Sequence, residues 1–161
     1  MTQLSHVDGQ GRARMVNVAA KVPTFRWALA KGSIVLSAAA FDAMQQQTLK
    51  KGDPFTVAKL AGISAAKRTD ELIPLCHSLP LEQIEIAFES DPSTSAIHVV
   101  CETATTAKTG IEMEAMTAVS VALLALYDMV KAVDPAATIT AIQLLRKTGG
   151  KTGFSRFKEA Y

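Results

Sequence analysis

An uncharged run at 115–127 constrains the fold of this chain more than any other feature of its sequence. The run contains Thr117 and Ser120 and is shorter than the roughly 20 apolar residues needed to cross a bilayer. It lies inside a predicted long helix, 111–133, that follows Gly110. A helix that is apolar on most sides is stable only when buried, within the fold or between subunits. We therefore expect a core helix and no membrane partner.

The composition is that of one well-packed globular domain. The chain has 161 residues, of which 48% are hydrophobic and 20% charged, and a domain typically holds about 100–200 residues. We expect a single domain over 1–161, with a flexible arm at 1–14 and a flexible tail at 150–161. The net charge is only +2 and aromatic residues make up 6%. Since nucleic-acid binders show a basic excess and interleaved aromatics, we expect no nucleic-acid partner.

The two cysteines and the first residues bear on the compartment. Cys76 and Cys101 form no CxxC pair, and the three histidines supply no metal-ligand spacing, so we expect neither a disulfide framework nor a metal site. Free thiols are typical of the cytoplasm. Residues 1–15 have no apolar stretch of the kind found in signal peptides. We expect a cytoplasmic protein.

The first half of the chain predicts one strand and two helices. Branched residues at 34–36 favour a strand. Ser37 is a candidate N-cap for a helix at 38–49. After a turn, Pro54 opens a second helix, because its fixed φ suits the first helical position, and this helix is expected to end near Glu71.

The second half predicts an antiparallel hairpin. Apolar and polar residues alternate at 81–89 and again at 97–103, with an Asp-Pro-Ser turn between them. We expect one face of this hairpin to be wet. A last strand is expected at 138–145. Because hairpins occur without regular βαβ alternation, the sequence predicts an α+β fold.

Asp128 and Lys131 are the most informative charged pair. They stand three residues apart on one helix face, directly after the uncharged run. They are placed to hold or exchange a proton, and a helix-end salt bridge worth a few tenths of a kcal/mol is the alternative. From Lys131 to Lys158, six basic residues stand against the single acid Asp134. This local excess of positive charge suits an anionic ligand.

Two loops carry further candidates. His77 lies beside Cys76 in the segment 73–80, where two prolines favour an ordered loop that holds an imidazole in one orientation. A structural histidine is the alternative there. The basic, glycine-rich segment 146–153 resembles the end of a P-loop, but Leu145 stands where that motif needs glycine. Phosphate contact and a solvated turn both stay open for this segment.

The long helix imposes a geometric condition on any compact site. Glu112 and Glu114 stand at its start, where carboxylates also stabilise the helix dipole. Asp128 lies fourteen residues after Glu114, which is about 21 Å along a helix. One site can use both helix ends only if two subunits contribute to it.

Four motifs follow one another along the chain: Leu75-Cys76-His77, Thr109-Gly110-Ile111-Glu112-Met113-Glu114-Ala115, Tyr127-Asp128-Met129-Val130-Lys131-Ala132-Val133 and Lys147-Thr148-Gly149-Gly150-Lys151. Together they closely resemble the cyclic pyranopterin monophosphate synthase family, also called molybdenum cofactor biosynthesis protein C. The resemblance covers essentially the whole chain.

This resemblance implies a fold, an assembly and a reaction. The implied subunit is α+β, with a ferredoxin-like antiparallel sheet packed with helices, and the implied assembly is a homohexamer built as a trimer of dimers with active sites at the dimer interfaces. The implied activity is that of a lyase that converts (8S)-3′,8-cyclo-7,8-dihydroguanosine 5′-triphosphate to cyclic pyranopterin monophosphate and pyrophosphate. This reaction involves no redox change, so we expect no cofactor.

The resemblance also assigns residues to the site. Asp128 matches the catalytic aspartate and Lys131 the lysine that accompanies it. The residues that match substrate-binding positions are Leu75, Cys76, His77, Met113, Glu114, Lys51, Lys67 and Lys147.

Asn17 departs from the family pattern, which usually has aspartate at this position. If that acid orients a pocket lysine, asparagine weakens the function or another group takes its place. The alternative function is a non-catalytic nucleotide-binding oligomer that uses the same lysines. The Asp128 and Lys131 pair argues against it, because binding an anion does not require a carboxylate.

Overall fold

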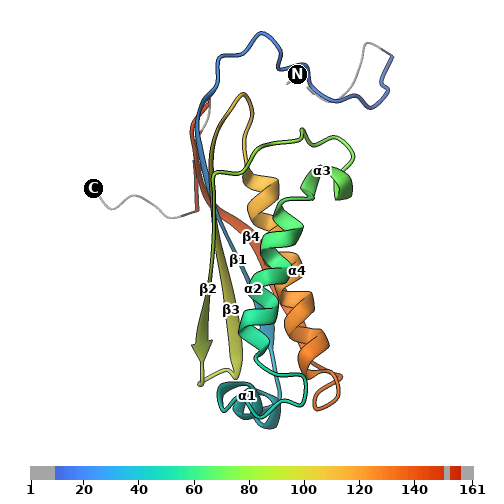
Figure 1. The fold of residues 1–161 in the computed structure, drawn as a ribbon, viewed down its shortest axis with the longest axis vertical. Helices are drawn as coiled ribbons and strands as arrows, with labels where there is room; N and C mark the ends of the chain where they lie inside the picture. The colour runs from blue at the N-terminus through green and yellow to red at the C-terminus, as the bar shows by residue number, and fades with distance from the viewer. Residues whose placement is uncertain (1–9, 151–152, 157–161) are drawn as a thin grey trace, which may run out of the picture.

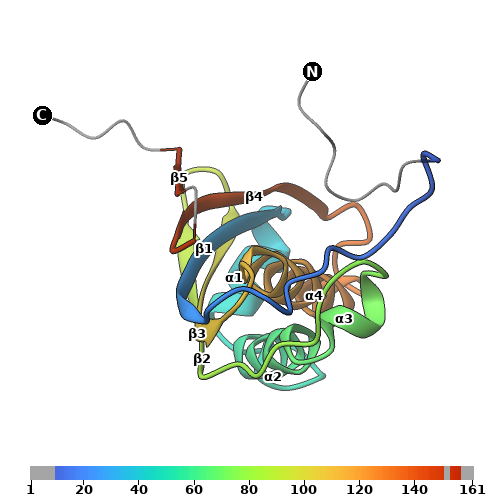
Figure 2. The ribbon, with the colours of Figure 1, turned by 90° about the horizontal axis from the view of Figure 1, so that it is seen from above.

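The computed structural model describes residues 10–150 and 153–156, which form one five-stranded antiparallel sheet with helices on one face (Figures 1 and 2). The strands lie in the order β2-β3-β1-β4-β5. The elements in chain order are β1 (Thr24–Val35), α1 (Ala38–Gln45), α2 (Pro54–Ala66), α3 (Thr69–Leu72), β2 (Gln83–Asp91), β3 (Ala96–Ala107), α4 (Glu112–Val130), β4 (Thr138–Thr148) and β5 (Phe154–Ser155). This arrangement confirms the predicted single α+β domain and is consistent with the ferredoxin-like type.

The hairpin of β2 and β3 has the predicted alternation. Ile86 of β2 and Ile97 and Val99 of β3 are buried toward the helices, whereas Glu85 and Glu89 are exposed. The two strands pair in antiparallel register from Gln83 opposite Ala104 onward. The alternation therefore identified the inner face of the sheet correctly.

Helix α4 is the core helix that the uncharged run predicted. Ala115, Ala118, Val119, Leu123 and Leu126 are all fully buried. By length and composition α4 would also pass for a membrane span, but most of its apolar side chains belong to the buried core. The helix contacts α2 and strands β1, β3 and β4, and Figure 2 shows it running between α2 and the sheet. Burial within the fold accounts for its composition.

Two glycines allow α4 and its neighbours to approach closely. A Cβ atom at Gly32 of β1 would lie 2.7 Å from Leu123 Cδ1, and one at Gly62 of α2 would lie 2.6 Å from Ile86 Cδ1. Both distances are too short for a real carbon contact. Gly32 therefore allows α4 to lie close to the sheet. The Gly62 Cβ would also lie 2.9 Å from the Ala118 carbonyl oxygen, so Gly62 allows α2 to lie close to α4.

Both helices of the first half are shorter than predicted. The first ends at Gln45, because Gln47 adopts a left-handed φ of 54° and the chain turns so that Leu49 returns to the core. The second ends at Ala66, and the buried Thr69 starts the separate short helix α3. The starts of both helices were predicted correctly, since the Ser37 hydroxyl accepts the Ala40 N–H and Pro54 is the first residue of α2.

The strands, in contrast, extend further than predicted. The strand expected at 34–36 is only the end of β1, and β3 and β4 run on beyond 103 and 145. β4 pairs with β1 through two irregularities, one of them near Ala141, whose φ is 52°. The predicted strand 138–145 is therefore confirmed as β4, and the second irregularity falls at Leu145, where the prediction ended the strand. Most of the predicted arm 1–14 and part of the tail 150–161 lie outside the described residues, and Phe154–Ser155 of the tail forms β5 against β4.

Candidate active site

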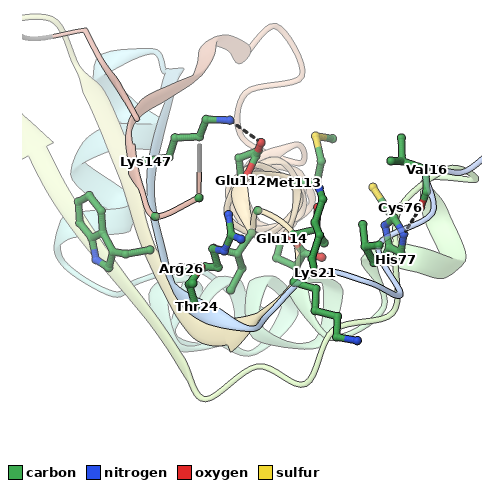
Figure 3. A pocket seen from close by; sticks show the side chains of 18 of the residues that line it. Val16, Lys21, Thr24, Arg26, Cys76, His77, Glu112, Met113, Glu114 and Lys147 are labelled. Atoms are coloured by element: carbon green, nitrogen blue, oxygen red, sulfur yellow. Dashed lines mark hydrogen bonds and ion pairs between the residues drawn. The ribbon is translucent and has the colours of Figure 1, made fainter. Parts of the chain in front are cut away.

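A cleft of about 810 Å³ opens at the end of the molecule where α4 begins (Figure 3). Its walls are the start of α4, the loop that follows α3, the first residues of β1 and the end of β4. Six of the predicted site residues line it: Leu75, Cys76, His77, Met113, Glu114 and Lys147. The structure thus brings together residues that lie more than 70 positions apart in the chain.

His77 holds a neighbouring segment against the cleft. Its Nε2 lies 2.8 Å from the Val16 carbonyl oxygen, as the dashed line in Figure 3 shows. A carbonyl only accepts hydrogen bonds, so Nε2 carries the proton. Lys108 donates to the Ala19 carbonyl at 2.8 Å on the same segment. The loop histidine therefore has a structural contact as well as a place in the cleft.

Asn17 lies in that segment and caps a local turn. Its Oδ1 accepts the Ala19 N–H at 2.9 Å. The carboxylate usual at this position would accept the same bond, because the amide oxygen and a carboxylate oxygen are equivalent acceptors here. The substitution therefore preserves the local turn while removing one negative charge near the cleft.

Glu114 is a buried carboxyl group that lines the cleft. Its side chain is 4% exposed, and burial, with smaller contributions from the nearby charges of Glu112 and Asp70, raises its pKa to about 7. At neutral pH both protonation states are populated, which suits a general acid or base. Burial also raises the pKa of Cys76, helped by Glu114 and Glu112, so Cys76 is a neutral thiol rather than a thiolate nucleophile.

The same pKa shift makes stability depend on pH. Because the folded-state pKa of Glu114 lies above the unfolded value of 4.5, the native state binds the proton more tightly, and stability falls as pH rises from about 4.5 through about 7. We expect Glu114→Gln to equal the parent below this window and to be more stable above it, by at most about 3 kcal/mol. Thermal unfolding at pH 4.5 and pH 8 measures this difference. The exposed Glu71→Gln is the control, and an equal change in both variants would contradict the assignment.

Several basic side chains line the same cleft as Glu114. Lys147 donates to Glu112 Oε1 at 2.8 Å, and both side chains are 28% exposed (Figure 3). Lys21 and Lys108 line the same cleft. An anion that enters the cleft meets cations held in a partly enclosed place, where their attraction is screened less than at an open surface.

Arg26 is a cleft residue that the sequence analysis missed. Its Nε donates to the Ala107 carbonyl at 3.2 Å. Gly149 and Gly150 have positive φ values of 91° and 77°, and a Cβ on Gly150 would collide with the Arg26 guanidinium. The glycine-rich segment is therefore shaped to fit around Arg26. A cation in phase with the buried Ala28 and Ala30 on β1 was the available signal.

A second charged group, the Asp128 cluster, lies at the opposite end of α4 and consists of Lys51, Asp128 and Lys131. Asp128 Oδ2 is 2.7 Å from Lys51 Nζ, and Asp128 Oδ1 is 2.7 Å from Lys131 Nζ. Hydrogen bonds from Lys131 and Lys51 lower the pKa of Asp128 to about 2. The same bond to Asp128 raises the pKa of Lys131. The predicted catalytic pair is therefore an ion pair at neutral pH, and Lys51 joins it.

Within one chain, the residues of the cleft and the Asp128 cluster lie far apart. Glu114 is in the first turn of α4 and Asp128 is in its last, about 21 Å apart along the axis. Lys51, Asp128 and Lys131 do not line the cleft, and neither does Lys67, the exposed C-cap of α2. Among residues 10–150 and 153–156, no group of three or more His, Cys, Asp or Glu side chains is placed to hold a metal ion.

Known proteins are similar in sequence to this chain over nearly its whole length. Residues 15–150 match the MoaC family. A protein of Thermomicrobium roseum is 46% identical over 153 residues, covering 95% of this chain and 92% of its own. Relatives from Chloroflexus aggregans and Methylobacterium nodulans are each 48% identical, covering 94% and 95% of this chain and 92% and 96% of theirs. All three relatives are named cyclic pyranopterin monophosphate synthase.

Proposed function

The chain belongs to the MoaC family, and from this premise we propose that it is a cyclic pyranopterin monophosphate synthase, a lyase of molybdenum cofactor biosynthesis. Its substrate is (8S)-3′,8-cyclo-7,8-dihydroguanosine 5′-triphosphate, and its products are cyclic pyranopterin monophosphate and pyrophosphate. We assign the enzyme to the cytoplasm. The observation that carries the proposal is the cleft itself, which is lined by a carboxyl group with a pKa of about 7 and by the basic residues Arg26, Lys108 and Lys147.

The cleft supplies both kinds of chemistry that this conversion needs. Opening the imidazole ring of the purine and building the pterin require proton transfers at ring nitrogens and oxygens, and Glu114 gives and takes protons at neutral pH. Closing the cyclic phosphate expels pyrophosphate. Lys147 and Arg26 line the cleft, and we assign to them the stabilisation of the negative charge that develops there.

We place the completed active site between two subunits. The Asp128 cluster of one chain meets the cleft of another, which removes the separation of about 21 Å along α4. Asp128, held ionised, orients the ammonium groups of Lys51 and Lys131 toward the reacting phosphate. Lys67, which lies outside the cleft of its own chain, contacts the triphosphate from the same side. The assembly is a homohexamer formed as a trimer of dimers.

Incubation with the cyclic dihydroguanosine triphosphate tests the function directly. We expect one pyranopterin monophosphate and one pyrophosphate for each substrate consumed, measured by mass spectrometry and a pyrophosphate assay. A non-catalytic nucleotide-binding oligomer would bind the triphosphate and leave it intact. The names of the relatives do not favour that alternative.

Lys147→Ala is expected to weaken pyrophosphate binding at least about tenfold, because a charge-assisted hydrogen bond is among the stronger single contacts to phosphate. Calorimetry at two salt concentrations measures the affinity, and the effect should persist at moderate salt because Lys147 is partly enclosed. Lys59→Ala is the control, since Lys59 pairs with Glu85 away from the cleft. Equal affinities for Lys147→Ala and the parent would remove Lys147 from the phosphate site.

A further inference from the structure

Asp134 is a buried acid that the proposed reaction does not use. Its side chain lies in the turn between α4 and β4, and the residue is only 7% exposed. Its Oδ2 accepts the Ser37 N–H at 2.6 Å, and its Oδ1 accepts the Ala136 N–H at 3.2 Å. Burying a carboxylate is costly unless hydrogen bonds compensate it, so these two backbone donors explain how Asp134 is tolerated there.

The bond to Ser37 joins two separate parts of the fold. Ser37 is the N-cap of α1 and follows β1, whereas Asp134 follows α4 and is tied to that helix by its own N–H, which donates to the Val130 carbonyl at 2.9 Å. Figure 1 shows α1 and the last turn of α4 at the same end of the molecule. Asp134 therefore links the start of α1 to the end of α4.

The positions of α1 and α4 determine whether Lys51 and Asp128 can meet. Asp128 is in the last turn of α4, and Lys51 lies in the connection from α1 to α2. Lys51 Nζ reaches both the carboxylate and the backbone carbonyl of Asp128, at 2.7 Å and 2.9 Å. The side chains of Lys51 and Asp128 are 45% and 54% exposed. Since exposed ion pairs contribute little to stability, the pair does not by itself hold the helices in this relation.

We infer that Asp134 is a positioning residue: its buried bond to the Ser37 N–H fixes α1 against the end of α4, so that Lys51 and Asp128 meet. The inference rests on the proposed catalytic role of the Asp128 cluster. Tyr127 supports the same region, since its hydroxyl donates to the Pro135 carbonyl at 3.1 Å across the turn that carries Asp134.

A pair of variants at Ser37 isolates this bond. Ser37→Pro removes the N–H that Asp134 accepts, and the Ser37 φ of −64° already matches proline. Ser37→Ala keeps the N–H and removes only the hydroxyl cap of α1. We expect kcat for product formation to fall about 10- to 100-fold more in Ser37→Pro than in Ser37→Ala, because displacing a reacting group by about 1 Å costs up to about 10²-fold.

Two further measurements separate positioning from general damage to the fold. Asp134→Asn retains one oxygen, which can accept the Ser37 N–H while the bond to the Ala136 N–H is lost, so it should recover part of the kcat that Asp134→Ala loses. In a crystal structure of Ser37→Pro, the Lys51 Nζ to Asp128 Oδ2 distance should exceed about 4 Å, the limit of an ion pair. In Ser37→Ala it should stay near the parent value of 2.7 Å.

The outcomes distinguish this inference from the proposed function. If folded Ser37→Pro keeps both the short Lys51 to Asp128 distance and the kcat of Ser37→Ala, Asp134 does not position the cluster. If the distance lengthens while kcat is unchanged, Asp134 positions the cluster but the cluster is not catalytic, which overturns its proposed role. If Asp134→Ala does not fold, the comparison of Ser37→Pro with Ser37→Ala still tests whether Asp134 positions the cluster.

Discussion

Asp128→Asn is expected to lower kcat by about 10²–10⁴-fold, the usual contribution of a positioned acid or base. Asparagine cannot form the paired charge contacts that Lys51 and Lys131 make with the carboxylate. Lys131→Ala is expected to have an effect of the same order. The rate of pyrophosphate release, measured on protein of verified fold and mass, checks both results.

The fold should survive these substitutions, because the Asp128 side chain is 54% exposed and lies outside the core. Asp42→Asn is the matched control, since Asp42 is an exposed acid on α1. A turnover near that of the parent for either Asp128→Asn or Lys131→Ala would remove that residue from the catalytic group. A loss shared by Asp42→Asn would point to a general effect of charge instead.

Mixing two inactive variants should restore activity when their lesions lie at opposite ends of α4. Glu114→Ala damages the cleft, and Asp128→Asn damages the cluster that completes the cleft of the neighbouring chain. In a mixed dimer one site then carries both lesions and the other carries none. Random pairing should restore about a quarter of the parent activity per site, since half of the dimers are mixed. Co-expression with differently tagged chains and an activity assay measure the recovery.

The structure also supplies the control for this experiment. Lys51 and Asp128 lie in one cluster of one chain, a point that the sequence left open. Co-assembled Lys51→Ala and Asp128→Asn chains place one lesion in every shared site, so no recovery is expected. Recovery by this pair, or none by Glu114→Ala with Asp128→Asn in verified mixed oligomers, would contradict the shared site. A fully active monomer would remove it altogether.

Sequence patterns predicted those helices and strands that depend on residues close together in the chain. The uncharged run identified α4, Ser37 and Pro54 marked the starts of α1 and α2, and alternation identified β2 and β3. The patterns missed the end of α1, where a turn after Gln47 returns the chain to the core, and the last residues of β4, which follow an irregularity in its pairing with β1. Such features depend on neighbours distant in sequence.

The residues of the candidate site were likewise predicted only in part. The sequence motifs named six residues that the structure gathers in one cleft, and the helix length already separated Glu114 from Asp128. Arg26 went unnoticed, because its place in the cleft depends on the shape of Gly149 and Gly150, more than 120 residues later. The roles of these residues in catalysis stay predictions.

By itself the sequence determined the fold class, the buried helix and the residue types available for the chemistry, because periodicity and composition act over a few turns or a strand. Only the tertiary structure decided which groups meet and how they titrate. Lys51 meets Asp128 across 77 positions, and the pKa of Glu114 rises to about 7 because the packed core removes water from its carboxyl group. Desolvation and charge contacts depend on distances in space, and sequence spacing does not contain those distances.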